Sequence, residues 1–288
     1  AREMEKSGIK IIYSIPGLKV HAKVALVERL EDGVMNTYAF LSTGNYNEKT
    51  ARIYCDHGLF TTDQRITGEI AKVFDYLENR TEGIQFQHLL VAQFGLLDRF
   101  STMIDEVIRA KGERYILIKL NGLEDTGMIE KLYEASQAGV KVDMIVRGIC
   151  CIKPGVPGMS ENIRVIRLVD RFLEHARIFY FKADGIDNLF MGSADWMARN
   201  LHRRIEVVFP VFDERIKKQV LDICDFQLRD NTKARQLDAN LQPLPFSTES
   251  RIKINAQLAT YAYVKAIQEK ILVDNKDIGV DQSKIRTE

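Results

Sequence analysis

The same arrangement of polar residues occurs twice in this sequence, once near the start and once in the second half. Each copy contains a histidine, a cation two residues later, a small-residue turn that ends in Asn or Asp, and a carboxylate eleven residues after that turn. The first copy comprises His21, Lys23, Asn45 and Asp56. The second comprises His175, Arg177, Asp195 and Glu206. Such a repeat predicts two similar lobes that contribute equivalent residues to one site.

The composition restricts the class of protein. A chain of 288 residues can form one large domain or two ordinary ones. A hydrophobic content of 45% with 28% charged residues is typical of a soluble globular protein. Because 41 basic and 40 acidic residues nearly cancel, no overall field predicts a polyanionic partner such as nucleic acid. Any anion site must come from local groups of cations.

The cysteines and the apolar runs bear on the location of the protein. Cys55, Cys150, Cys151 and Cys224 form no CxxC motif, so a reduced, cytoplasmic setting is expected. No apolar run approaches the ~18 residues of a membrane-spanning helix, so no transmembrane segment is expected. The first residues, AREMEKSGIK, contain no initiator methionine and do not resemble a signal peptide. We therefore expect the chain to be part of a longer protein.

The first part of the chain is predicted to contain mainly strands. Runs rich in β-branched and aromatic residues occur at Ile9–Ser14, Ala22–Glu28 and Tyr38–Ser42. Apolar residues with helical spacing then begin at Ile66, and this helix is expected to end near Asn79. A polar stretch follows at 79–83. It divides the expected first lobe, residues 1–84, from the second, residues 85–288.

The second part alternates strands and helices. We expect a strand over Phe86–Val91, a helix over Leu96–Ala110, a strand over Tyr115–Leu120, a helix from Asp125 to about Gln137, and a strand over Val140–Val146. This rhythm predicts a mixed, mainly parallel sheet flanked by helices. The expected fold class is α/β, with two lobes related by a pseudo-two-fold axis and the site between them.

The repeated residues suit phosphoryl chemistry. A neutral imidazole is a nucleophile near pH 7 if one ring nitrogen keeps its proton, and a carboxylate that accepts this N–H fixes the tautomer. Asp56 and Glu206 are the candidates, and the repeat predicts that each histidine has the carboxylate of its own copy. Residues i and i+2 of a strand share a face, so Lys23 and Arg177 would reach the pocket of their histidines.

Several alternatives remain open at this point. Asp56 and Glu206 also suit ordinary ion pairs. Gly44 and Gly192 suit either a turn or a phosphate contact. Asn45 can donate from its amide whereas an ionised Asp195 cannot, so the two copies are not expected to be equivalent. Three further histidines lack a repeated context. We expect His57 and His88 to be structural and His202 to lie at the rim.

The repeated His-x-Lys/Arg with a trailing Asn or Asp resembles the phospholipase D-like superfamily. The match departs from the usual pattern at four positions. Glu28 stands where an aspartate is usual, and the second copy has Arg177 for lysine, Lys182 at the acidic position and Asp195 for asparagine. These departures argue against a plain phospholipase or nuclease.

A closer resemblance covers nearly the whole chain. Five strings look like the C-terminal half of the bacterial polyphosphate kinases of the ATP-dependent polymerising type: Pro16–Lys23, Ser42–Tyr54, Val146–Gly148, Asp170–His175 and Ser193–Asn200. The resemblance implies reversible transfer of the ATP γ-phosphoryl group to polyphosphate through a phosphohistidine.

The resemblance assigns roles to individual residues. His21 matches the phosphorylated nucleophile, and His175 matches the second essential histidine, a general acid/base or charge stabiliser. Tyr54, Arg147 and His175 match positions that contact the nucleotide. Candidates for contacts with phosphate or polyphosphate are Asn45, Asp195, Arg199 and Arg203.

The resemblance also implies cofactors and partners. Mg²⁺ is expected to arrive with ATP, because the expected protein ligands lie outside this chain. ATP or ADP and inorganic polyphosphate are the expected partners, and the intact protein is expected to be a homo-oligomer. Membrane association of the cytoplasmic protein is left open. Two alternatives remain, namely a phospholipase D-like phosphodiesterase and an inactive fragment that binds nucleotide or polyphosphate.

Overall fold

Two equivalent groups of antiparallel strands follow the two histidines. The computed structural model describes residues 2–13, 15–244 and 252–277. In the first lobe, the strands β2 (Val24–Glu31), β3 (Val34–Ser42) and β5 (Gly58–Thr61) pair in this order. In the second lobe, β11 (Arg177–Ala183), β12 (Ile186–Gly192) and β14 (Val207–Pro210) pair in the same way. The repeat in the sequence is therefore a repeat of structure.

The repeat continues into the next helix of each lobe. α3 (Gln64–Asn79) follows β5, and α7 (Glu214–Leu228) follows β14. Asp63 and Asp213 cap these helices by accepting hydrogen bonds from backbone N–H groups of the first turn. Each capping aspartate lies seven residues after the carboxylate of its copy.

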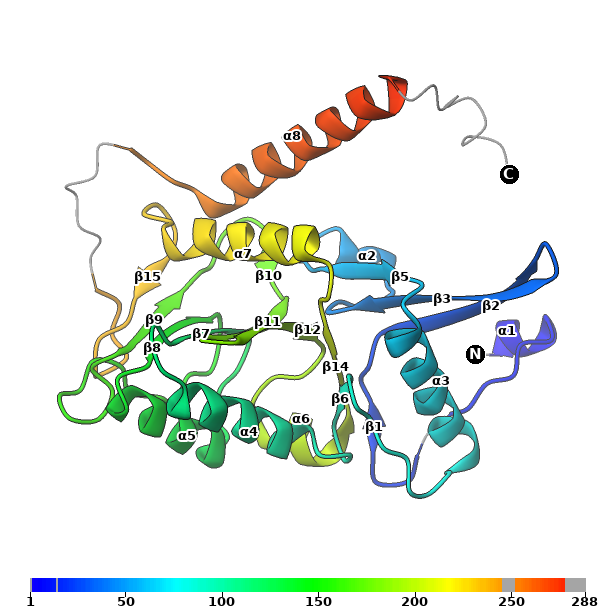
Figure 1. The fold of residues 1–288 in the computed structure, drawn as a ribbon, viewed down its shortest axis with the longest axis horizontal. Coiled ribbons are helices and arrows are strands. Elements are labelled where there is room, and N and C mark those ends of the chain that lie inside the picture. The colour runs from blue at the N-terminus through cyan, green and yellow to red at the C-terminus, as the bar shows by residue number, and fades with distance from the viewer. Residues whose placement is uncertain (1, 14, 245–251, 278–288) are drawn as a thin grey trace.

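The second lobe extends its antiparallel strands into a larger sheet. Eight strands of the described residues form it, in the spatial order β15 (Arg235–Gln236), β9 (Ile163–Arg167), β8 (Lys141–Val146), β7 (Tyr115–Leu120), β11, β12, β14 and β6 (Leu90–Val91). The helices α4 (Leu96–Arg109) and α5 (Thr126–Gln137) lie along one face of this sheet, and α7 lies along the other (Figure 1).

The α/β fold class with flanking helices is confirmed, but the sheet is less parallel than the sequence predicts. Within the large sheet, β7, β8 and β9 pair in parallel, and the other neighbours are antiparallel. Two-residue Asp-Gly turns explain the antiparallel hairpin of each lobe. Asp32-Gly33 joins β2 to β3, and Asp184-Gly185 joins β11 to β12. Connections this short can join only antiparallel strands.

Two predicted strands of the sequence are shorter or absent. Residues 9–13 form no strand, and Ser14 lies outside the described residues. Of Phe86–Val91, only Leu90–Val91 pairs as β6. The backbone N–H groups of residues 87–89 donate instead to the Glu69 carboxylate of α3, which leaves them unable to join a sheet.

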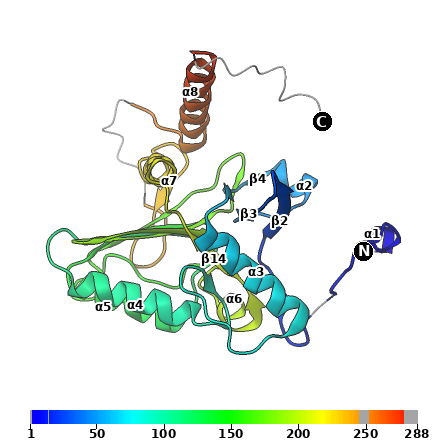
Figure 2. The same cartoon turned by 45° about the vertical axis from the view of Figure 1, so that its right-hand side comes forward.

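The remaining elements are short or peripheral. They are α1 (Arg2–Lys6), α2 (Glu48–Ala51), α6 (Ala198–Arg203), α8 (Ala256–Asp277) and the two-residue strands β1 (Lys19–Val20), β4 (Tyr54–Cys55), β10 (Leu173–Glu174) and β13 (Arg204–Ile205). α8 starts beside α7 and projects away from the sheets (Figures 1 and 2). Within the described ranges, no helix is long and apolar enough to cross a membrane.

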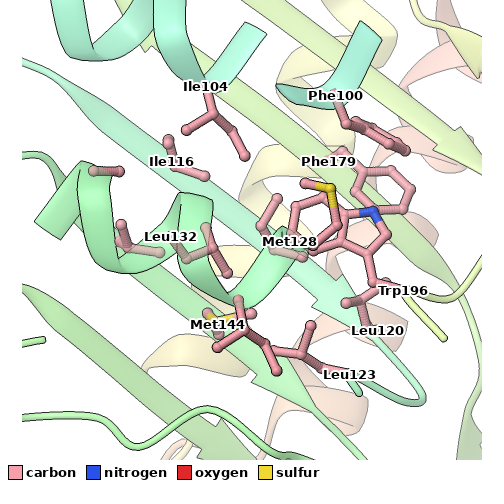
Figure 3. Packing of buried hydrophobic residues seen from close by; sticks show 14 of the residues in the cluster. Phe100, Ile104, Ile116, Leu120, Leu123, Met128, Leu132, Met144, Phe179 and Trp196 are labelled. Carbon is pink, nitrogen blue, oxygen red and sulfur yellow. The ribbon is translucent and has the colours of Figure 1, made fainter. Parts of the chain in front are cut away.

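The hydrophobic interior has two parts, one on each face of the large sheet. Between the sheet and α4/α5, the centroid of the Phe179 ring lies 4.6 Å from the centroid of the Phe100 ring and 5.7 Å from that of the Trp196 ring (Figure 3). The part on the opposite face crosses between the lobes, because Leu41 and Ile70 of the first lobe belong to the same cluster as Ile178, Phe209 and Val220. The two lobes therefore share one interior.

Two phenylalanines provide a matched test of this packing. Phe179→Ala removes a fully buried ring, so we expect the free energy of unfolding in urea to fall by about 3–5 kcal/mol. Phe60→Ala removes a ring that is 80% exposed, so we expect a loss below about 1 kcal/mol. Similar losses for both variants would contradict the described interior.

Candidate active site

Two very short parallel pairings connect the lobes and carry the repeated histidines. β1 pairs with β13, and β10 pairs with β4. The backbone N–H groups of His21 and Ala22 donate to the Ile205 carbonyl over 2.9 and 3.1 Å. Those of His175 and Ala176 donate to the Cys55 carbonyl over 3.0 and 3.2 Å. This reciprocal arrangement is what a two-fold relation between the lobes requires.

The lobes exchange their carboxylates. His21 Nδ1 lies 2.9 Å from Glu206 Oε2, and His175 Nδ1 lies 2.9 Å from Asp56 Oδ1. The prediction that each histidine pairs with the carboxylate of its own copy is therefore wrong. In each pairing, one strand ends just before a histidine and the other just before the opposite lobe's carboxylate. The equal spacing in the two copies is compatible both with carboxylates that stay within their copy and with carboxylates that are exchanged. The sequence therefore does not distinguish the two arrangements.

Residues of the repeated turns hold the two carboxylates. Thr43 Oγ1 donates to Asp56 Oδ1 over 2.7 Å, and Ser193 Oγ donates to Glu206 Oε2. Burial opposes the charge on Asp56, but hydrogen bonds from His175 and Thr43, together with the nearby Arg177, hold the pKa of this carboxyl below its ordinary value. Asp56 is therefore ionised near pH 7.

Glu206 has two further partners that the sequence did not identify. Asn200 Nδ2 donates to Glu206 Oε1 over 2.7 Å, and Arg204 Nη1 lies 3.8 Å from the same oxygen. Glu206 is fully buried, so these groups compensate for the water that it has lost. Thr43 and Ser193 could have been found from their equivalent places in the two turns, whereas Asn200 and Arg204 have no counterpart in the first copy.

Each turn contains a glycine that close packing requires, although the two glycines are not at equivalent positions. A Cβ atom on Gly44 would lie 2.1 Å from Asp56 Oδ2. A Cβ atom on Gly192 would lie 2.5 Å from the Val207 carbonyl oxygen. Both glycines thus allow the segment at or next to the carboxylate to approach the turn. Neither glycine has the positive φ that a turn glycine needs.

The two cations lie in different environments. Lys23 Nζ donates to the His21 carbonyl, and burial lowers the pKa of this amine to about 8. Arg177 crosses between the lobes, since Nη1 lies 3.1 Å from His175 Nε2 and 3.2 Å from the Thr43 carbonyl oxygen. Arginine remains charged in this setting, whereas lysine can lose its proton.

Asp195 and Asn45 occupy equivalent positions but have different surroundings. Asp195 is buried, and it accepts hydrogen bonds from Arg177 Nη2 over 2.9 Å and from the Asn121 N–H over 2.7 Å. Burial opposes its charge, but Arg177 holds the pKa of Asp195 below its ordinary value. Asn45 is exposed, three residues after the end of β3. The structure thus places Asp195 behind Arg177 as an anionic acceptor, and it leaves Asn45 facing solvent.

His175 is held neutral near pH 7. Burial and the Arg177 charge lower the pKa of its imidazole, although the hydrogen bond to Asp56 opposes this shift. With Nδ1–H donated to Asp56, Nε2 carries the lone pair.

Three residues surround His175 on the side of Tyr54 and Arg147. The ring centroids of Tyr54 and His175 lie 4.8 Å apart. Asn121 connects His175 to Arg147, because it donates to the His175 carbonyl over 3.0 Å and accepts from Arg147 Nε over 2.8 Å.

Arg199 and Arg203 lie on the exposed side of α6. Within the described part of the chain, neither makes a hydrogen bond or ion pair with the two histidine–carboxylate pairs. Arg204, the next residue along the chain, is instead the cation beside Glu206. Its half-buried side chain makes it a further candidate phosphate contact, in the same local group of cations as Arg199 and Arg203.

The side chains of the other three histidines are not hydrogen-bonded to these pairs among the contacts described. Burial lowers the pKa of His57 to about 4, so this half-buried residue is neutral. His88 packs edge-on against Phe212 with ring centroids 5.7 Å apart. His202 is exposed, with Nε2 3.6 Å from Asp125 Oδ2.

The carboxylates of the site do not fit a divalent cation. Asp56 and Glu206 face histidines, and Asp195 faces Arg177. Magnesium binds oxygen ligands and repels the cations that occupy these positions. In the ranges that the structure describes, no three His, Cys, Asp or Glu residues are grouped as a metal site.

Asp56→Asn tests the exchange of carboxylates. Because the Asp56 charge and hydrogen bond raise the pKa of His175, we expect this pKa to fall further in the variant. A titration of the His175 ring signals by NMR measures it. The matched control is Glu206→Gln, which should leave the His175 pKa unchanged because Glu206 contacts His21. A shift of the His175 pKa in the control alone would contradict the pairing.

The comparisons with known proteins agree over nearly the whole chain. The family described as Polyphosphate kinase C-terminal domain 1 matches residues 1–83, and Polyphosphate kinase C-terminal domain 2 matches residues 89–257. The polyphosphate kinase of Escherichia coli K12 is 42% identical over 272 residues, which are 93% of this chain and 40% of that protein. The polyphosphate kinase of Halalkalibacterium halodurans is 46% identical over 239 residues, 82% of this chain and 34% of that protein.

Solved structures show the same similarity. The crystal structure of polyphosphate kinase from Porphyromonas gingivalis matches with a TM-score of 0.87 and 44% identity, covering 93% of this chain and 42% of that chain. A phosphatidylserine synthase of Haemophilus influenzae shares the fold at 10% identity, with a TM-score of 0.50 over 83% of this chain and 70% of that chain. The chain thus spans about 40% of the length of its polyphosphate kinase relatives. On these matches, the chain belongs to the polyphosphate kinase family.

Proposed function

We propose that this chain forms the phosphoryl-transfer site of an enzyme that moves the ATP γ-phosphoryl group reversibly to polyphosphate through a phosphohistidine. The observation that carries the proposal is the pair of histidines, each with its Nδ1 on a carboxylate of the opposite lobe and with a cation beside it. Family membership supports the substrates, since the curated relatives are polyphosphate kinases.

His21 is the proposed nucleophile. Its Nδ1–H is donated to Glu206, so Nε2 carries the lone pair that attacks phosphorus. A P–N bond forms and the bond from phosphorus to the ADP oxygen breaks. The imidazole gains positive charge in this step, and the buried Glu206 carboxylate offsets it. In the second half-reaction, a terminal polyphosphate oxygen attacks phosphorus and the P–N bond breaks.

His175 is the proposed second catalytic histidine. In its neutral form Nε2 accepts a proton, and the resulting imidazolium returns the proton in the reverse direction. Asp56 supports the charged form through Nδ1, and Arg177 opposes it from the Nε2 side. Because Asp56 and Arg177 act in opposite directions, His175 is suited to gain and lose a proton during phosphoryl transfer rather than to stay charged.

The proposed substrate contacts surround the two histidines. Tyr54 and Arg147 face the nucleotide on the His175 side, and Lys23, Arg177 and Arg204 offset charge on the transferring phosphoryl group. Asn45, Arg199 and Arg203 are exposed and suit the passing polyphosphate chain. Magnesium enters with the ATP phosphates in this proposal, because the carboxylates of this site are engaged with histidines and cations.

Labelling with γ-³²P-ATP tests the nucleophile. We expect the full-length polypeptide to acquire an acid-labile, base-stable label, and His21→Ala to abolish it because no other imidazole has the Glu206 partner. His175→Ala should retain the fold and reduce turnover by roughly 10²–10⁴, the usual contribution of a catalytic acid or base. Both variants need circular dichroism as a check on folding.

The same experiment separates the alternatives. Full synthesis by His21→Ala would refute the phosphohistidine. Label on the full-length polypeptide but not on residues 1–288 alone would show that this part lacks essential parts of the site, and binding of polyphosphate without any label would favour an inactive binding fragment. Absence of label together with hydrolysis of a phosphodiester would favour a phospholipase D-like phosphodiesterase.

The low pKa of Lys23 predicts how the activity of the enzyme depends on pH. Its amine has a pKa of about 8, so its charge is lost as the pH rises, and about one amine in ten remains charged one pH unit higher. We expect kcat/KM for polyphosphate to fall above pH 8. Lys23→Arg should remove this fall, because the guanidinium stays protonated. An unchanged alkaline limb in Lys23→Arg would assign the limb to another group.

A further inference from the structure

The strand that leads to His175 is supported from the side opposite to its pairing partner. β10 has two residues, and the first lobe contacts one edge of it: the Leu173 N–H donates to the Ile53 carbonyl over 2.8 Å and the His175 N–H to the Cys55 carbonyl over 3.0 Å. The backbone groups of Phe172 point the other way, as alternate residues of a strand do. An unpaired edge so short would leave the segment before His175 poorly fixed.

Gln257 of α8 lies along this second edge. The Phe172 N–H donates to Gln257 Oε1 over 3.1 Å, and Gln257 Nε2 donates to the Phe172 carbonyl over 2.8 Å. The side-chain amide thus pairs with both backbone groups of one residue, as the next strand of a sheet would. The same Nε2 also donates to Glu174 Oε1 over 2.9 Å. One side chain therefore spans Phe172 to Glu174, directly before His175.

Glu174 connects this edge to the centre of the large sheet. Its other oxygen, Oε2, accepts from Lys119 of β7 over 2.6 Å and from Gln227 of α7 over 2.9 Å. The side chains of Glu174 and Lys119 are each only 3% exposed. Burial opposes the charge on Glu174, but Lys119 and Gln257 hold the pKa of this carboxyl below its ordinary value. The carboxylate is thus a fixed buried anion, which orients the amide of Gln257.

The start of α8 is itself held in place, so Gln257 has little freedom. Asn255 accepts from the Leu258 N–H over 2.9 Å as the helix cap, and it donates to Asp170 Oδ2 over 2.7 Å. The Ala256 N–H donates to Asp230 Oδ2 over 2.7 Å. The equivalent strand in the first lobe, β1, is exposed at both of its residues. Among the residues that the structure describes, no side chain pairs with the β1 backbone in this way, so this support is seen only for the second histidine.

We propose that Gln257 is a positioning residue that fixes His175, and with it Tyr54, by completing the outer edge of β10. The inference rests on the proposed function, because it assigns Gln257 to the nucleotide side of that site. Leu173 is the pairing partner of Tyr54, and the Tyr54 ring contacts the His175 imidazole. Movement of β10 would therefore displace both groups together. His21 is supported by β13 and would keep its place.

Gln257→Met is the sharpest variant. Methionine has nearly the same length and fills the same space, but it cannot make the three hydrogen bonds. Gln268→Met is the matched control, since Gln268 lies on the exposed part of the same helix. Both variants are made in the full-length polypeptide and assayed below the midpoint of thermal unfolding.

The kinetic readout separates positioning from stability. Loss of folded enzyme lowers kcat and leaves KM for ATP unchanged. Misplacement of His175 and Tyr54 raises KM for ATP as well. For Gln257→Met we expect kcat to fall and KM to rise, with a combined loss in kcat/KM of about 10–100-fold, as seen when groups that orient a metal ligand are removed. Gln268→Met should match the parent protein.

A second readout does not depend on turnover. By NMR, we expect the ring signals of His175 to shift or broaden in Gln257→Met while those of His21 remain. If the parent protein transfers no phosphoryl group, the proposed function fails, and the His175 signals still decide the positioning role. Unchanged His175 signals, or a lower kcat with an unchanged KM in an active enzyme, would overturn the assignment of Gln257.

Discussion

The exchange of carboxylates between the lobes is the constraint on which the site depends. Neither copy of the repeat can orient its own histidine, because the partner of each imidazole belongs to the other lobe. The pairings that deliver these groups involve only two residues per strand. A shift of one residue in either pairing would turn a histidine or a carboxylate to the opposite face. The register must therefore be set by the interior that the lobes share, where Leu41 and Ile70 pack with residues of the second sheet.

Equivalent scaffolds carry unequal chemistry because the cations differ. Lys23 contacts the backbone of its histidine and has a pKa near 8, so it responds to pH and to a bound anion. Arg177 contacts the ring of its histidine, and the buried Asp195 holds it in that position. His175 is consequently kept neutral, while the Lys23 amine contacts only the backbone carbonyl of His21 among the contacts described for the two. The two histidines thus differ in the cation beside them, although their scaffolds are equivalent.

The sequence predicted elements whose signals are local. The helix from Asp125 to Gln137 and the strand Tyr115–Leu120 agree with the structure, because a cap and an apolar run define them without help from distant residues. The antiparallel hairpins were also encoded locally, by the Asp-Gly pairs at 32–33 and 184–185, but the helix–strand rhythm of the second lobe favoured a parallel sheet. The strand expected at Phe86–Val91 is shortened by Glu69, a residue of another helix.

The candidate site shows the same limit. The repeat predicts that His21, His175, Lys23, Arg177, Asp56 and Glu206 act together. In the structure they form two hydrogen-bonded groups, one around each histidine, and the charges of Glu206, Arg177 and Asp56 all act on Lys23. Which carboxylate faces which histidine depends on how the lobes cross, and no spacing in the sequence records that. The contact of Gln257 with Phe172 is equally hidden, because an amide that pairs with backbone groups has no preferred spacing.

The two buried ion pairs that flank His175 indicate that the second lobe holds this histidine in a fixed position. Glu174 of the Lys119–Glu174 pair directly precedes this histidine, and Arg177 of the Arg177–Asp195 pair follows two residues after it, with N–O distances of 2.6 and 2.9 Å. Removing such charges from water costs several kcal/mol per ion, and apolar residues of similar volume are often neutral or stabilising in their place. Folding stability is thus a poor explanation for both pairs. Each pair fixes either a backbone segment or a charge next to the His175 imidazole. An electrostatically preorganised site holds its groups in place in this way before substrate arrives.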